Sequence, residues 1–278
     1  MIYLHRPGLI SALGNGTAAT LATLYDPAAQ PLIDEDGWLP GRRLAVGRCP
    51  AHDWQPLPAG LPPAYHTANN RLLWQALCQM APTIRAAVAR FGAERVAVVL
   101  GTSTSGGDAN RAALTAHAHG TPWAEAGFSV AKQRMSAPAD FTATAYRLRG
   151  PAYGISTACT SGARALISAA RLLGSGAADA VICGGVDTLS ALTMHGFAAL
   201  ELLSAARARP FAAARDGINL MSSTLVFEHG DKPFGDIQAE QLRAYRRAWA
   251  EAGHDWAPRE SVSRSIFPLL SPRDAGLY

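Results

Sequence analysis

The stretch that decides the fold is Ile155-Ser-Thr-Ala-Cys159-Thr-Ser-Gly-Ala163. A short extended segment leads directly into apolar residues at helical spacing, which predict a helix over residues 160–173, closed by Gly174. The small neighbours of Cys159 leave room for a tight turn and for a substrate. We therefore expect Cys159 to lie at the N-terminus of a helix, in the turn that joins a strand to it.

This position suits a nucleophile. The partial positive charge of a helix N-terminus favours the thiolate, and a thiolate is the form that attacks a thioester carbonyl. Backbone N–H groups of the turn are expected to hold the developing oxyanion. The alternative is a buried structural cysteine, the common fate of a free thiol. Of the other three cysteines, Cys183 is expected to be structural, and no activating neighbour is visible for Cys49 or Cys78.

Strands and helices alternate on both sides of this turn. Residues 70–91 carry apolar side chains at helical spacing, and residues 95–100 form a β-branched run typical of a buried strand. A second helix is predicted over 139–148, and a second buried strand over 180–183. The alternation predicts an α/β fold with a layered sheet.

The N-terminal region is less regular. Residues 8–13 are predicted to form a short strand, and Thr17 is expected to cap a helix that runs to Tyr25. Residues 27–65 hold eight of the eighteen prolines. We interpret this segment as a long irregular loop without helix or sheet.

Composition excludes several classes of function. The 278 residues are 49% hydrophobic with a net charge of +4, and the basic residues are scattered, so no nucleic-acid role is expected. The N-terminus does not resemble a signal peptide, and no apolar run is long enough to span a bilayer, so the cytoplasm is the expected location. The cysteine spacing predicts neither a zinc site nor a disulfide framework.

Several motifs, in order along the chain, resemble those of β-ketoacyl-[acyl-carrier-protein] synthases. They are Gly8-Leu-Ile-Ser-Ala-Leu-Gly14, Val98-Val-Leu-Gly-Thr-Ser-Thr-Ser-Gly106, Thr157-Ala-Cys159-Thr-Ser-Gly162, Ala178-Asp-Ala-Val-Ile-Cys-Gly-Gly-Val-Asp187, Gly196-Phe197-Ala-Ala-Leu, Leu203-Ser204 and Arg209-Pro-Phe211 with Arg215-Asp-Gly217. The resemblance covers residues 1–218. It implies the N-terminal half of a thiolase-like layered α/β/α fold, and homodimers, as in the family.

The same resemblance implies a mechanism. Cys159 would accept an acyl chain from an acyl-carrier protein or from acyl-CoA, in fatty-acid or polyketide-type biosynthesis. In the family, two histidines, a lysine and a phenylalanine from the second half of the fold then support decarboxylative condensation. No metal and no cofactor is implied.

The histidine motifs of that second half do not follow residue 218. Neither a His-Gly-Thr-Gly-Thr nor an Asn-Ser-Phe-Gly-Phe-Gly-Gly type of segment is present, and His229 and His254 have different neighbours. We expect both to be solvated loop residues. His195 falls in a predicted helix, where packing is its expected role.

Residues 219–278 resemble a different family. Charged residues number 31 in the first 218 positions and 15 in the last 60. The segments Asn219-Leu-Met-Ser-Ser-Thr-Leu225, Lys232-Pro-Phe-Gly-Asp-Ile-Gln-Ala-Glu-Gln241, Ala244-Tyr-Arg-Arg-Ala-Trp-Ala-Glu-Ala-Gly-His-Asp255 and Ser261-Val-Ser-Arg-Ser-Ile-Phe267 are similar to luciferase-like flavin-dependent monooxygenases. A fragment of this length cannot close the TIM barrel that the resemblance implies. A helix over 239–252 and strands over 224–228 and 261–267 are predicted; a gene fusion or an assembly artefact would each explain the join.

Three hypotheses follow. The first is a truncated ketoacyl-synthase relative that loads an acyl group on Cys159 but is impaired in condensation. The second is a non-catalytic subunit that pairs with a synthase or with itself. The third, which the tail alone supports, is a flavin-dependent monooxygenase fragment. Without a second half to cover it, the first 218 residues are expected to expose apolar surface and to favour oligomers.

Overall fold

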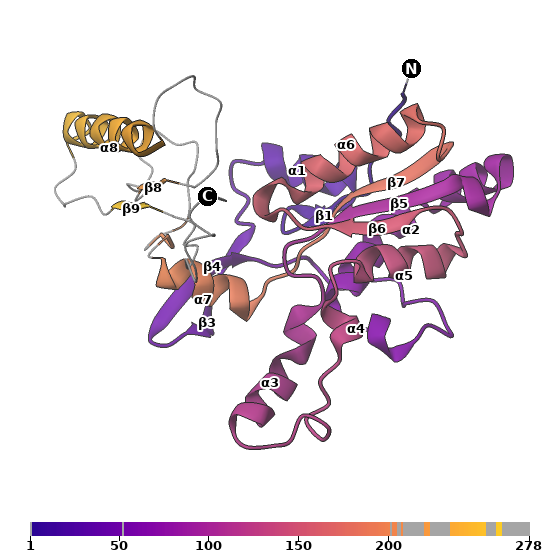
Figure 1. Ribbon diagram of the computed structural model, residues 1–278, viewed down its shortest axis with the longest axis horizontal. Helices are drawn as coiled ribbons and strands as arrows, with labels where there is room; N and C mark the ends of the chain where they lie inside the picture. Colours follow the sequence, from indigo (N-terminus) through magenta and orange to yellow (C-terminus); the bar gives the residue numbers. More distant parts are fainter. Residues whose placement is uncertain are drawn as a thin grey trace, which may run out of the picture. The chain divides into compact units, whose positions relative to one another are not determined.

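The computed structural model describes residues 2–51, 53–200, 202–204, 207, 220–222, 234–253 and 260–262 (Figure 1). The chain divides into two compact units, residues 1–196 and 197–278. The first unit holds the Cys159 turn and the sheet around it. The assignment of residues 219–278 to a second family stays a prediction.

A three-stranded parallel sheet forms the centre of the first unit, in the order β6-β5-β7. Strand β5 (Val96–Gly101) is buried along its whole length, because its apolar residues are covered on both faces. It pairs with β6 (Ala152–Ile155) on one side and with β7 (Ala180–Gly185) on the other. The register brings the ends of all three strands to one edge of the sheet, and the predicted strands over 95–100 and 180–183 are confirmed.

Helices cover both faces of this sheet. Helix α6 (Ser161–Gly174) lies over one face, while α2 (Ala68–Phe91) and α5 (Ala137–Tyr146) lie against the other (Figure 1). The predicted α/β fold with a layered sheet is therefore confirmed, as are the predicted helices over 70–91 and 139–148 to within two residues at each end.

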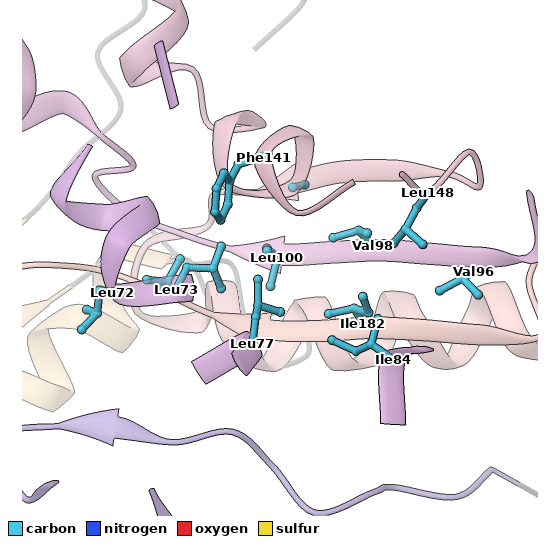
Figure 2. Close-up of a cluster of buried hydrophobic side chains, with 12 residues drawn as sticks. Leu72, Leu73, Leu77, Ile84, Val96, Val98, Leu100, Phe141, Leu148 and Ile182 are labelled. Atoms are coloured by element: carbon cyan, nitrogen blue, oxygen red, sulfur yellow. The ribbon is translucent and has the colours of Figure 1, made fainter. Parts of the chain in front are cut away.

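Side-chain alternation along β5 builds the core. Val96, Val98 and Leu100 point to the face covered by α2 and α5, where they meet the leucines of α2 and Phe141 of α5 (Figure 2). Each buried aliphatic side chain of this kind stabilises the fold by roughly 1.5–3 kcal/mol. The cluster consists of Leu72, Leu73, Leu77, Ile84, Val96, Val98, Leu100, Ala139, Phe141, Leu148, Ile182 and Val186.

Polar groups fix α2 in place. The Thr67 hydroxyl accepts a hydrogen bond from the Asn70 N–H at 3.2 Å, which caps the helix N-terminus. The Tyr146 hydroxyl of α5 donates to the Leu77 carbonyl at 3.2 Å, and burial raises the pKa of that phenol to about 12. The phenol therefore stays protonated and joins α5 to α2 at physiological pH.

The connection from β5 to α5 contains η3 (Gly107–Asn110), α3 (Arg111–Ala118) and α4 (Val130–Gln133). Asn110, in η3, is fully buried and binds Ser129, the residue before α4. Its amide donates to the Ser129 carbonyl at 2.8 Å, and its carbonyl accepts from the Ser129 N–H at 3.0 Å. The two ends of the segment from residue 110 to residue 129 are therefore held side by side.

The N-terminal region departs from expectation. The strand predicted over residues 8–13 is reduced to β1 (Ile10–Ser11), which pairs with β2 (Gly14–Asn15) in a short hairpin. Helix α1 (Thr17–Tyr25) is present as predicted, but Gly16 is its N-cap and no side chain caps it.

The segment 27–65 is not the irregular loop that we predicted. It contains an antiparallel hairpin of β3 (Leu32–Leu39) and β4 (Arg42–Gly47), which turns at Pro40-Gly41. Opposite charges on the two strands face each other: Arg43 pairs with Asp36 at 3.4 Å. Cross-strand pairs of this kind stabilise a hairpin of low hydrophobicity. The prolines of this segment lie outside the two strands, before, after or in the turn between them, so they interrupt no hydrogen bond between the strands.

Short helices complete the first unit: η1 (Pro63–Tyr65), η2 (Ala93–Arg95), and α7 (Ala191–Ala199), which runs across the boundary of the units. In the second unit, α8 (Phe234–Glu251) contains most of the helix predicted over 239–252. Strand β8 (Leu220–Ser222) pairs in parallel with β9 (Glu260–Val262), at the start of the strand predicted over 261–267. The strand predicted over 224–228 lies outside the described residues. Within the described part of the chain, no helix is long and apolar enough to cross a membrane.

Candidate active site

Cys159 lies in the turn between β6 and α6. Strand β6 ends at Ile155. The short helix η4 (Ala158–Thr160), which contains Cys159, directly precedes α6, whose first residue is Ser161. The predicted strand-to-helix turn is therefore present, with the helix starting one residue later than expected. The predicted closure at Gly174 is wrong, because Gly174 is still helical and the left-handed residue after the helix is Gly176 (φ 71°).

The backbone of this turn is strained. Ala158 adopts φ 52°, a left-handed conformation that costs a residue with a Cβ roughly 1–2 kcal/mol. Hydrogen bonds hold it there: the Ser161 hydroxyl donates to the Ala158 carbonyl at 2.6 Å and accepts from the Thr157 N–H at 2.9 Å. The Thr160 hydroxyl donates to the Thr157 carbonyl at 2.8 Å. The turn is thus fixed on both sides of Cys159.

Glycines at the strand ends let α6 approach the sheet closely. A Cβ on Gly101, at the end of β5, would lie 2.5 Å from the Ser161 carbonyl carbon and 2.7 Å from the Gly162 nitrogen. On β7, a Cβ on Gly185 would lie 3.5 Å from the Gly162 Cα. The first turn of α6, and with it Cys159, therefore rests against the edge where the strands end. Neither glycine is marked by its neighbours in the sequence, because the atoms that its Cβ would meet belong to other elements of the fold.

Cys159 is exposed, whereas the other three cysteines are half-buried. The alternative of a buried structural cysteine is thereby wrong for Cys159. Burial raises the pKa of the thiols of Cys49, Cys78 and Cys183. Cys183 lies within β7, in agreement with the structural role expected of it. Cys159 is consequently the thiol most open to a bulky substrate.

A loop from the neighbouring strand contacts the turn. Residues 102–105 follow β5, and the Ser103 hydroxyl donates to the Ala158 carbonyl at 3.3 Å. The carboxylate of Asp187, just after β7, accepts from the N–H groups of both Ser103 and Thr104. Asp187 ends the segment 178–187 that carries part of the family resemblance, but no role was expected of it. Its bonding partners lie 83 to 85 residues away in sequence, a separation at which a single sequence gives no pairing signal.

Of the three histidines considered in the sequence, the structure describes only His195. His195 lies on α7 with its side chain exposed, so the packing role expected of it is wrong. Two large hydrophobic residues of α7 are also exposed, Leu192 at 76% and Phe197 at 42%. His229 and His254 lie outside the described residues. In the part of the chain that the structure describes, no group of three or more His, Cys, Asp and Glu side chains is arranged to hold a metal ion.

Apolar side chains on α6 are exposed to solvent. Leu166 is 46% exposed and Ile167 is 53% exposed, although both belong to the helix that carries the turn. The opposite side of the helix is buried at Ala165 and Ala169, which contact the sheet side. The apolar surface expected on this half of the fold is therefore present on α6.

Comparisons with known proteins agree on one family. The family model "Beta-ketoacyl synthase, N-terminal domain" matches residues 69–222. The chain is 32% identical over 198 residues to 3-oxoacyl-[acyl-carrier-protein] synthase 2 of Vibrio harveyi, an alignment that covers 66% of this chain and 47% of that protein. It is 36% identical over 110 residues to the tetracenomycin polyketide synthase ketoacyl synthase alpha subunit of Streptomyces glaucescens, covering 37% of this chain and 24% of that one.

Solved structures show the same fold. A chain in the complex of the ketosynthase ApeO with its chain length factor ApeC, from Xenorhabdus doucetiae, is 34% identical with a TM-score of 0.64, covering 76% of this chain and 55% of that one. The ishigamide ketosynthase/chain length factor, at 20% identity, has a TM-score of 0.64 and supports the fold alone. The chain spans about half the length of these relatives at most.

Proposed function

Because the chain belongs to the β-ketoacyl synthase family, we propose that Cys159 accepts an acyl group from a thioester donor and carries it as an acyl-enzyme. The observation that supports this most is the exposed Cys159 in a strained turn between β6 and α6. Strain that is held by several hydrogen bonds is typical of functional sites. A cysteine that only packed would need neither the exposure nor the strain.

The transfer step follows from this geometry. The Cys159 thiol loses its proton, and its Sγ attacks the carbonyl carbon of the donor thioester. The tetrahedral intermediate collapses by breaking the bond between the carbonyl carbon and the donor sulfur. The donor thiolate then takes up a proton and leaves. Backbone N–H groups at the turn before α6 are the groups that we expect to hold the oxyanion.

The acyl-enzyme is the intermediate needed for a decarboxylative Claisen condensation of the fatty-acid or polyketide type. The proposal for this chain is limited to acyl loading, because His229 and His254 lie outside the described residues and neither stands in a motif of the family's second half. Condensation requires groups that activate a malonyl thioester, and we assign none here.

An acyl-carrier protein is the donor that we propose first, and acyl-CoA is the second. The relatives in Vibrio species carry the acyl-carrier protein in their names. The net charge of +4 suits an acidic partner, since opposite charges steer association. A carrier protein that loads Cys159 better than the same acyl group on CoA, with the difference lost at high salt, would support this order.

A second candidate function rests on a separate observation. Helix α6 exposes Leu166 and Ile167, and a related ketosynthase was solved in complex with a chain length factor. A non-catalytic role as a pairing subunit would use such apolar surface. Light scattering coupled to size exclusion, combined with the acyl-loading assay, separates the two: a non-catalytic pairing subunit forms a defined dimer and takes up no acyl group on Cys159.

Peptide mass spectrometry tests the proposed loading. After incubation with acyl donors, trypsin releases the peptide of residues 150–164, in which Cys159 is the only cysteine. The wild type should gain the mass of the acyl group on this peptide, as should a Cys183→Ser control. The variant Cys159→Ser should gain none. An adduct that persists in Cys159→Ser, or that sits on another cysteine in the wild type, contradicts the proposal.

A further inference from the structure

The carboxylate of Asp187 gathers the loop that follows the neighbouring strand. Asp187 lies just beyond the end of β7, and the register places Gly185 of β7 opposite Gly101 of β5. One oxygen, Oδ1, accepts hydrogen bonds from the Thr102 hydroxyl at 2.8 Å, the Ser103 N–H at 2.9 Å, and the Thr104 N–H and hydroxyl at 3.0 Å each. The loop therefore wraps around a single charged group.

Ser103 connects this carboxylate to the Cys159 turn. Its N–H also donates to Oδ2 of Asp187 at 3.0 Å, so that both carboxylate oxygens fix its backbone. From that position its hydroxyl donates to the carbonyl of Ala158, the residue with the left-handed backbone. Asp187 thus reaches the residue before Cys159 through a single intermediate, Ser103.

The rest of the loop is built to stay in place. Thr102 is fully buried, and its hydroxyl accepts from the Ser105 N–H at 2.8 Å while donating to Asp187. The Thr102 N–H donates to the Ile155 carbonyl at the end of β6 at 3.0 Å. The loop is therefore bonded to the ends of both neighbouring strands, and Ser103 is the member that faces the turn.

We propose that Asp187 is a positioning residue, which holds Ser103 against the Ala158 carbonyl and thereby fixes the strained turn that presents Cys159. The inference rests on the proposed function insofar as the turn serves acyl transfer. Asp187 does not act as a general base here, because its Oδ1 already accepts four hydrogen bonds and its Oδ2 a fifth contact. Its contribution is geometric.

The same strand supplies a matched control. Asp179 precedes β7 at its other end and accepts from Arg95 Nε at 2.7 Å, which joins β7 to the start of β5. Both aspartates are exposed and both tie β7 to the chain around β5. Of these two aspartates, only Asp187 is connected by hydrogen bonds, through Ser103, to the Cys159 turn. A decrease in exchange protection that both variants share therefore reports a loss of stability alone.

Hydrogen exchange of the backbone amides of residues 157–161 is the primary measurement, because it does not depend on any catalytic activity. In Asp187→Ala these amides should exchange roughly two- to tenfold faster, as expected for the loss of one or two holding contacts. Asp179→Ala should leave them unchanged. Asp187→Asn keeps an acceptor at Oδ1 and should fall between. Ser103→Ala should speed exchange, and the variant that combines it with Asp187→Ala should exchange no faster than Asp187→Ala, because the two residues act in series.

Acyl loading is then measured on the same proteins. If loading occurs in the wild type, Asp187→Ala should slow it roughly tenfold, since small displacements of a reacting group are costly. Unchanged exchange in Asp187→Ala, or equal effects in Asp179→Ala, overturns the inference. If Asp187→Ala does not fold, Asp187→Asn and Ser103→Ala provide the same comparison. If the variants show the expected differences in exchange but the wild type takes up no acyl group, the proposed function is contradicted and the positioning role of Asp187 still holds.

Discussion

The close approach between Gly101 and the first turn of α6 makes a quantitative prediction. In Gly101→Ala the new Cβ would lie 2.5 Å from the Ser161 carbonyl carbon, while ordinary contact begins at 3.4 Å. The neighbouring atoms are backbone and cannot rotate away, so the start of α6 has to move by about 0.9 Å. Overpacking of this kind costs about 2 kcal/mol. For a unit of this size the cost lowers Tm by about 6 °C.

The shift also displaces Cys159, because it lies two residues before Ser161. A displacement near 1 Å reduces the rate of a well-oriented reaction by up to about 100-fold. Thermal unfolding followed by circular dichroism and acyl loading on the peptide of residues 150–164 are the two assays. Gly174→Ala at the other end of α6 is the control, since a Cβ there meets nothing within 4 Å. A Gly101→Ala protein with the wild-type Tm and loading rate would refute the packing argument.

Two further predictions concern the thiols and the core. Iodoacetamide at pH 8 should label Cys159 before Cys49, Cys78 and Cys183. Labelling of those three should rise only at higher pH, because burial raises the pKa of their thiols. Equal labelling rates for all four cysteines in peptide mass spectra would contradict this. Phe141→Ala should lower the free energy of unfolding by about 3–5 kcal/mol, because Phe141 is fully buried between α2 and the sheet; a loss below about 1 kcal/mol in urea denaturation would show that it is not a core residue.

The central layers could be predicted from the sequence because their signals are local. The run of β-branched residues in β5 and the helical spacing in α2 each specify one element, and each was found nearly at its true bounds. The hairpin of β3 and β4 was missed because its strands carry charged residues where a buried strand carries apolar ones. Its stability depends on pairs across the two strands, such as Arg43 with Asp36, and no pattern within either strand shows them.

In the candidate site too, residues with a local sequence signal could be predicted and residues that depend on distant contacts could not. Cys159 could be singled out as the candidate nucleophile because the residues that mark its turn, and that carry the family resemblance there, are contiguous in the sequence. Gly101 and Asp187 were not assigned because their roles depend on contacts with residues far away in sequence, made only when the parallel strands bring their ends to one edge. The packing role expected of His195 failed for a related reason: a helical position does not by itself say which side of the helix is covered.

The most direct test of the account is the mass of the peptide of residues 150–164 after folded wild-type protein is incubated with an acyl-carrier protein bearing an acyl chain. The account predicts an added acyl group on Cys159, removed by hydroxylamine and absent from Cys159→Ser. An unmodified peptide from protein with an intact thermal transition, across acyl chains of several lengths and with acyl-CoA as well, would contradict the claim that this cysteine carries an acyl group.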